Sequence, residues 1–246
     1  MVEWPRFPNA PITEALLDIR VKLPSTIDLR RLETFQDSVT DRYPDRRERS
    51  AWQAGFEMKE GSVRVIEPSG RPDGYLFTSK DGRQIVQARL DGFTFNRLKP
   101  YDKWETFRDE ARQLWEQYLR IATPEIVSRV ALRYINRLNL PLPLKDFREY
   151  ILTTPEIASN LPQGLSSFFM RLVIPQEKSK ATAIVTETIE PPQENRLPLI
   201  FDIDVFREVT FDPTGLEMWE GMEQLRQLKN EIFFNSVTEK AKELFK

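Results

Sequence analysis

The sequence of 246 residues contains no cysteine and no histidine. Without cysteine there is no thiolate nucleophile, no disulfide and no cysteine–zinc site. Without histidine there is no imidazole metal ligand, no Ser–His or Cys–His catalytic pair, and no side chain that ordinarily titrates near neutral pH. Catalysis would have to rely on carboxylates, lysine, tyrosine, serine, threonine or a carboxylate-bound metal ion. The composition therefore disfavours an enzyme.

Glycine is also scarce, and the nine glycines form neither a G-x-G-x-x-G nor a G-x-x-x-x-G-K-[ST] motif. We therefore predict no nucleotide-binding loop and no cofactor. No apolar run reaches the roughly 18–20 residues that cross a membrane. The first residues, M-V-E-W-P-R-F-P, lack the basic start and apolar stretch of a signal peptide. These absences predict a cytoplasmic protein with no membrane partner.

The charges are nearly balanced, with 36 Lys and Arg against 38 Asp and Glu, a net charge of −2 and a pI near 5.6. Nucleic-acid binding depends largely on the neutralisation of phosphates, so a nucleic-acid partner is disfavoured. The densest basic cluster, Arg42–Arg49, is interrupted by Asp45 and Glu48. We interpret this cluster as a solvated loop.

The order of predicted elements indicates an α+β fold in which helices pack on antiparallel sheet. The first half, residues 1–122, comprises an arm, a strand, a helix, an antiparallel meander and an aromatic helix. The second half, residues 123–246, comprises an arginine-containing strand, a short helix, three strands and a long helix from about residue 214. We expect the halves to pack as one unit. Their similar order is consistent with a degenerate duplication, and the first half has the order of helix-grip folds.

Two Asp-Gly pairs, Asp81-Gly82 and Asp91-Gly92, are the strongest hairpin signals in the meander. The helix that follows repeats aromatic residues at spacings of three and four, including Trp104 and Trp115. Such a face is typical of core packing, and stacking on a cofactor is the alternative.

The strand predicted over residues 126–139 carries three arginines in step. Arg129, Arg133 and Arg137 occupy odd positions, while the even positions are largely apolar. Because successive side chains of a strand point to opposite faces, the arginines form a basic row. We call Arg129, Arg133 and Arg137 the arginine ladder. On the apolar face, Asn136 is expected to be a core amide with satisfied hydrogen bonds.

Three interpretations of the arginine ladder stay open. Asp202, Asp204 and Glu208 share one face of a later strand, and cross-strand pairing with them would make the ladder structural. Asp18 and Arg20 would join that network. Alternatively, the ladder binds a small anion, because the guanidinium fork suits anions, or it contacts a nucleic-acid backbone.

Two further groups are candidates. Asp202 and Asp204 form a D-x-D arrangement that can hold Mg²⁺ together with a third oxygen ligand. The proline-rich N-terminal segment is predicted to be an extended arm with apolar anchors, docked on its own sheet or on a neighbouring chain. The predicted interaction residues of this arm are Trp4, Phe7, Asn9, Pro11 and Ile12.

Several stretches resemble one prokaryotic family of uncharacterised, sporadically distributed proteins. They are the N-A-P-I-x-E-A start at 9–15, the L-R-Y-I-N motif at 132–136, the segment at 99–104 and the apolar final helix. The resemblance implies an accessory gene setting such as defence or toxin–antitoxin loci. It assigns no catalytic residues, and this chain lacks the histidine that the family usually has in its last helix.

These observations lead to three hypotheses. The first is a non-enzymatic module that binds a protein partner, a peptide or a second copy of the chain through a sheet face and the arm. The second is a sensor of a small anionic ligand or nucleotide, with a pocket lined by the arginine ladder. The third is an enzyme that uses a divalent cation at Asp202 and Asp204.

Overall fold

The structure is a computed structural model that describes residues 4–51, 56–59, 62–65 and 70–246. Within these residues the chain is α+β, as predicted, and its main element is a nine-stranded antiparallel sheet in the order β2-β5-β6-β7-β1-β8-β11-β10-β9. Two further strands form a separate ribbon, β3 (Phe56–Lys59) with β4 (Ser62–Val65). The strands of the large sheet are β1 (Ile12–Lys22), β2 (Asp45–Ala51), β5 (Arg71–Thr78), β6 (Gln84–Arg89), β7 (Gly92–Leu98), β8 (Ile126–Pro141), β9 (Phe169–Gln176), β10 (Ala181–Ile189) and β11 (Arg196–Arg207).

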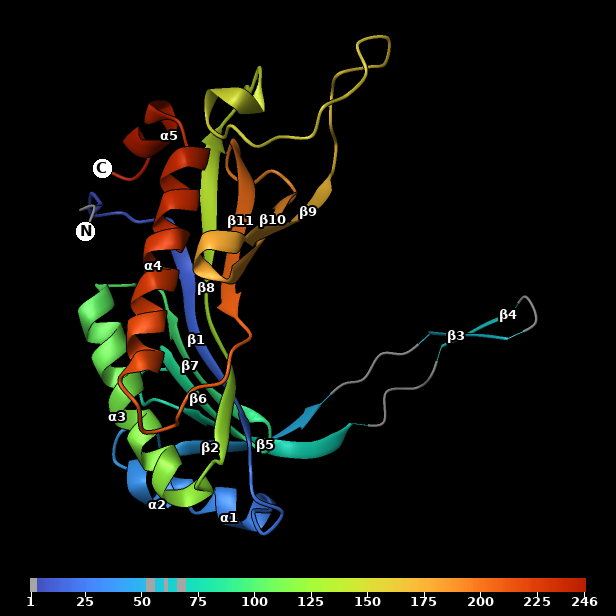
Figure 1. Cartoon of the computed structure of the whole chain (residues 1–246). Helices are drawn as coiled ribbons and strands as arrows, with labels where there is room; N and C mark the ends of the chain where they lie inside the picture. Colours follow the sequence, from blue (N-terminus) through green and yellow to red (C-terminus); the bar gives the residue numbers. More distant parts are fainter. Residues whose placement is uncertain (1–3, 52–55, 60–61, 66–69) are drawn as a thin grey trace.

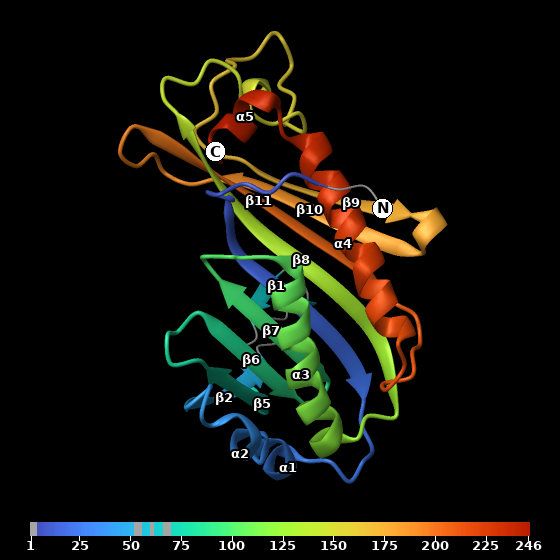
Figure 2. The ribbon, with the colours of Figure 1, turned by 90° about the vertical axis from the view of Figure 1, so that its left-hand side faces the viewer.

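The helices cover one face of this sheet (Figures 1 and 2). The long helix α3 packs beside β7, and α4 crosses β8 and β11. No helix of the described residues is long and apolar enough to cross a membrane. The helical segments are α1 (Leu29–Glu33), α2 (Phe35–Val39), α3 (Trp104–Ala122), α4 (Glu217–Ser236) and α5 (Glu239–Glu243), with 3₁₀ turns η1 (Phe147–Glu149) and η2 (Glu177–Ser179).

The two halves of the chain meet at the centre of the sheet. β1 and β8 pair antiparallel, with Leu17 opposite Leu132 and Ile19 opposite Val130. The ranges 1–122 and 123–246 therefore contribute to one continuous sheet and share one core. Each half starts with a central strand and continues with a meander whose last strand pairs with that central strand. A long helix follows the meander in each half.

The alternation in β8 follows the sequence pattern. Val130, Leu132, Tyr134 and Leu138 are buried under the helices, and each buried aliphatic side chain contributes about 1.5–3 kcal/mol to folding. Asn136 is also buried on this face, and its amide donates to the Phe201 carbonyl oxygen over 2.9 Å. It is thus held by hydrogen bonds within the core, as expected.

The aromatic helix and the hairpins agree with the sequence pattern. Trp104 and Trp115 of α3 are buried in the core, and Trp115 packs edge-on against Phe93 of β7. Asp81-Gly82 and Asp91-Gly92 lie at the β5–β6 and β6–β7 connections. Gly92 is required by a close approach, since a Cβ there would lie 2.2 Å from the Ile19 carbonyl oxygen.

The prediction of a solvated loop over Arg42–Arg49 was wrong, because its second part belongs to β2. Residues from Asp45 onward pair with β5, with Arg47 opposite Leu76. β2 is the terminal strand of the sheet, so its side chains remain largely exposed. Charged residues are common on such edges because they discourage pairing with other chains. The high charge of this segment therefore indicated a loop where the chain forms a strand.

Candidate functional site

The arginine ladder lies on the sheet face opposite the helices, and each arginine has an acidic partner. Arg133 binds both carboxylate oxygens of Asp202, with hydrogen bonds that include one of 2.9 Å from Nε and one of 2.6 Å from Nη2. Arg137 pairs with Glu190 at 3.0 Å. Arg129 pairs with Asp18 at 3.2 Å and with Asp204 at 3.6 Å. The arginines are brought together on one face, and their charges are already matched.

Asp18 of β1 is the centre of this network. Its carboxylate accepts hydrogen bonds from Arg89 over 2.8 Å, from Arg129 over 3.2 Å, from Arg20 over 3.1 Å and from Thr94 over 2.7 Å. Burial alone would raise the pKa of Asp18, but the guanidinium groups of Arg89 and Arg20 outweigh burial and lower the pKa below its ordinary value. The sequence indicated the contributions of Asp18 and Arg20, but gave no sign of Arg89.

The hollow above this network is wide and open, and five arginines and three acidic side chains line it. Its volume is about 760 Å³. Its charged lining residues have both signs, and they are Asp18, Arg20, Arg49, Arg89, Arg129, Arg133, Asp204 and Glu208. A small anion entering here would compete with carboxylates that already occupy the guanidinium groups. The geometry favours a structural role for the arginine ladder.

Asp202 and Asp204 also lie on this face. The Asp202 carboxylate is held by the hydrogen bonds from Arg133, and Asp204 faces Arg129. A divalent cation would need a third acidic ligand, and no group of three His, Cys, Asp or Glu side chains among the described residues is placed to hold a metal ion.

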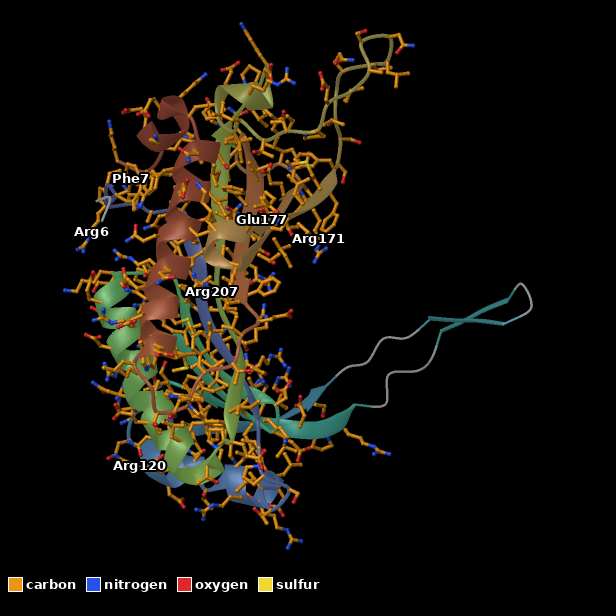
Figure 3. The ribbon with its side chains drawn as sticks, viewed as in Figure 1. Arg6, Phe7, Arg120, Arg171, Glu177 and Arg207 are labelled. Carbon is orange, nitrogen blue, oxygen red and sulfur yellow. The ribbon has the colours of Figure 1, made fainter. Side chains whose placement is uncertain are left out.

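The N-terminal arm docks on its own chain. Trp4 stacks on Phe234 of α4 with ring centres 4.8 Å apart, and Phe7 packs edge-on against Phe245. The backbone N–H of Asn9 donates to the Phe245 carbonyl oxygen over 2.9 Å, and its side-chain amide donates to the Lys246 carbonyl oxygen over 2.7 Å. The arm therefore lies beside the C-terminal residues of the chain (Figure 1), and Figure 3 places Phe7 next to the C-terminal part of α4.

Docking of the arm closes one side of a cavity of about 130 Å³, which we call the arm cavity. Its walls come from four segments far apart in the sequence: the arm, the loop before α3, β8 and α4. The lining residues are Trp4–Phe7, Ala10–Ile12, Tyr101–Trp104, Tyr134, Asn136, Arg226, Lys229, Asn230, Phe233 and Phe234. The predicted arm residues Trp4, Phe7, Pro11 and Ile12 thus form a wall, whereas Asn9 anchors the arm outside it.

Three strongly buried polar side chains line the arm cavity. Lys229, Asn230 and Asn136 are 9%, 8% and 2% exposed. The Lys229 ammonium has no carboxylate of the described residues within 4.0 Å, and its Nζ lies 3.9 Å from the centre of the Tyr134 ring. The Asn230 amide makes no side-chain hydrogen bond to another described residue. Buried polar groups are normally paired. The Lys229 amine and the Asn230 amide are therefore available to a ligand, whereas the Asn136 amide already donates to the Phe201 carbonyl oxygen.

The electrostatics of Lys229 follow from this setting. Burial lowers its pKa to about 7, and the neighbouring Arg226 guanidinium acts in the same direction. Arg226 itself has acidic partners, with Glu223 at 2.6 Å and Glu105 at 3.9 Å. Near neutral pH the amine of Lys229 is therefore divided between its charged and neutral forms.

The two tyrosine hydroxyl groups of the arm cavity stay neutral. The hydroxyl groups of Tyr101 and Tyr134 are 3.0 Å apart and share a hydrogen bond. Burial raises the pKa of Tyr101 to about 12 and holds the pKa of Tyr134 well above its ordinary value. Both phenols therefore stay protonated at neutral pH, where the amine of Lys229 titrates.

Lys229, Asn230 and Arg226 were not anticipated from the sequence. The available signal was Lys229 itself, which follows the apolar positions Leu225 and Leu228 of the final helix and precedes Ile232. A lysine in that position is usually placed at the edge of the apolar face, with its amine in water.

A scan against models of known protein families matches none, and a search of curated proteins finds no similar sequence. The resemblance to the sporadically distributed prokaryotic family, with its accessory gene setting, stays a prediction.

Proposed function

We propose that the protein binds a small organic anion in the arm cavity. The observation that carries this proposal is the buried amine of Lys229, which faces the cavity without a carboxylate partner among the described residues. An anion beside Lys229 would supply the missing partner and favour the ammonium form. The ligand class is that of the second hypothesis, a small anion, but its site is Lys229 and not the arginine ladder.

The lining restricts the ligand. A cavity of about 130 Å³ suits a small molecule, and the rings of Tyr101, Trp104, Tyr134 and Phe233 offer flat apolar walls. Asn230 offers both an amide donor and an acceptor for a polar group of the ligand. These features favour a small carboxylate with a planar or apolar body.

The stretches that carry the family resemblance give further support. Ala10–Ile12 from the N-A-P-I start, Tyr101–Trp104, Tyr134 and Asn136 of the L-R-Y-I-N region, and Phe233 and Phe234 of the final helix all line the arm cavity. Segments separated by most of the chain thus converge on one small space.

We expect acetate, benzoate or inorganic phosphate to bind wild-type protein, and Lys229→Met to weaken this binding about 10–100-fold, the loss of one charge-assisted hydrogen bond. Isothermal titration calorimetry measures the affinities. Because the anion favours the ammonium form, binding at pH 7–8 should take up a proton, and the Kd should rise about tenfold per pH unit above the pKa of Lys229, about 7.

Two controls make this test specific. Lys103 also lines the arm cavity but is exposed, so Lys103→Met should change the affinity little. Lys229→Met removes a buried charge and should fold at least as stably as wild type, which circular dichroism checks. Equal affinities of wild type and Lys229→Met, or no binding of any of the three anions, would contradict the proposal.

A second candidate function is self-association through the edge strand β9. Phe169 and Val173 are 71% and 54% exposed, and they flank Arg171 on the face away from α4, where Figure 3 labels Arg171. Exposed apolar side chains on a terminal strand favour an interface, and a second copy meeting this edge about a two-fold axis is the simplest occupant.

If this candidate is correct, sedimentation velocity will show a concentration-dependent dimer of wild type that Phe169→Asp with Val173→Asp abolishes. Leu216→Asp is the matched control, because Leu216 is 63% exposed but lies outside β9. A wild-type monomer at all concentrations would rule out the homodimer.

We also infer that the two halves arose by duplication. In the first half β1 pairs with β7 and α3 follows, and in the second half β8 pairs with β11 and α4 follows. The helix-grip order of the first half would then apply to both. Superposition of residues 70–122 on residues 169–236 tests the inference, since related halves should align strand for strand.

A further inference from the structure

The amine of Lys229 lacks the carboxylate partner that four other lysines of the described residues have. Lys22, Lys240, Lys242 and Lys246 each pair with a glutamate. Lys229 instead places Nζ over the Tyr134 ring, inside a cavity walled by aromatic rings and amides. The cationic Arg226, one turn earlier in α4, lines the same cavity and acts on the charge of Lys229.

This environment makes Lys229 a nucleophile as well as a cation. Burial and the Arg226 guanidinium lower the pKa of Lys229 to about 7, so about half of the amine carries a free lone pair at neutral pH. A solvated lysine with an ordinary pKa has well under 1% of its amine neutral at that pH. Desolvated lysines next to another cation are the ones that attack carbonyl groups in proteins.

We propose that Lys229 forms a reversible imine with the carbonyl carbon of a small ligand that also carries an anionic group. The inference rests on the proposed function and deepens it, because it names the ligand class as small oxo acids. Arg226 lines the same cavity and pairs with Glu223 through Nη1, while its Nη2 lies 3.9 Å from Glu105. The more loosely paired Nη2 would face the anionic group of the ligand while Nζ of Lys229 attacks the carbonyl carbon.

The step needs no oxidant and no further reactant. The lone pair of Nζ attacks the carbonyl carbon, the C–N bond forms, and the carbonyl oxygen takes one of the amine protons to give a carbinolamine. The C–O bond then breaks and the nitrogen loses its remaining proton. The carbonyl oxygen leaves with both protons as one water molecule, and the imine remains. The Asn230 amide lines the cavity where the carbinolamine hydroxyl would form.

Reductive trapping tests this inference. Wild-type protein is incubated at pH 7 with glyoxylate and sodium cyanoborohydride, and the peptides are mapped by mass spectrometry. We expect one carboxymethyl group at Lys229, with at least tenfold higher occupancy than at any other lysine. Lys229→Arg should lose this modification, Lys103→Met should keep it, and an excess of acetate should slow it by occupying the same cavity.

Calorimetry without the reductant separates the two proposals. Glyoxylate binding that depends on Lys229, but yields no adduct at Lys229, would overturn the imine and leave anion binding in place. An adduct distributed evenly over exposed lysines would also overturn the imine. Neither binding of glyoxylate nor an adduct at Lys229 would refute both proposals.

Discussion

Glu187→Gln should raise the free energy of unfolding by about 2–5 kcal/mol at pH 9 and leave it nearly unchanged at pH 4. Glu187 lies in β10 on the helix-covered face and is 0% exposed. Neither carboxyl oxygen has a hydrogen-bond partner among the described residues. Burial raises its pKa from 4.5 to about 8, so the buried group is protonated at neutral pH.

The direction of the pH dependence follows from this shift. Because the folded pKa is higher than the unfolded pKa, the folded state binds the extra proton between pH 4.5 and about 8. Wild-type stability from this group is therefore greatest at low pH and falls as pH rises through that window. Glutamine has the size of the neutral acid and no proton to lose, so the variant avoids the fall.

Urea denaturation at several pH values measures the effect. Glu177→Gln is the matched control, since Glu177 is exposed and its substitution should change the unfolding free energy little at either pH. A difference between wild type and Glu187→Gln that is the same at pH 4 and pH 9 would show that Glu187 titrates normally.

Asp18→Ala should lower the free energy of unfolding by about 3–5 kcal/mol at pH 7, the cost of removing one partner from a buried charge network. The substitution leaves Arg89, with 3% side-chain exposure, and Arg129, with 22%, without their shared carboxylate. Asp91 contacts Arg89 and Arg20 too, but its side chain is 53% exposed. Asp91→Ala should therefore cost no more than about 1 kcal/mol.

The same network contributes the opposite pH dependence from Glu187. The pKa of Asp18 is lower in the folded state, so its stabilisation is present above the unfolded pKa of about 3.8 and is lost as pH falls through the lower folded value. In Asp18→Ala this acid-dependent loss should be absent. Equal costs for Asp18→Ala and Asp91→Ala would mean that the arginine ladder does not depend on its buried carboxylate.

The sequence predicts the sheet well where one face is apolar. In β8 the even positions from Val130 to Leu140 are buried, and the odd positions carry the arginine ladder. It also anticipates the acidic row on β11, because alternation is a local property of each strand. It does not determine the partners. Arg133 pairs with Asp202 of β11 and Arg129 pairs with Asp18 of β1 because β8 lies between these two strands.

Sequence patterns did not predict the arm cavity, because they do not determine which distant segments become neighbours. Its walls come from the arm, the loop before α3, β8 and α4, and the arm reaches the other three because it docks beside Phe245. Helical periodicity places Lys229 near the apolar face of α4, but it does not tell whether the amine reaches water. In the folded chain the arm covers Phe234 and the Lys229 amine lies over the ring of Tyr134, so the amine faces the arm cavity.

The central claim is that Lys229 is a titrating, ligand-accessible amine of the arm cavity. A titration of lysine ¹³Cε resonances by NMR tests it directly, with Lys229→Met providing the assignment. The account predicts one resonance with a midpoint near pH 7 that is missing in Lys229→Met and moves to a higher midpoint when acetate is added. If every lysine resonance titrates near pH 10 and none responds to acetate, the arm cavity is not an anion site.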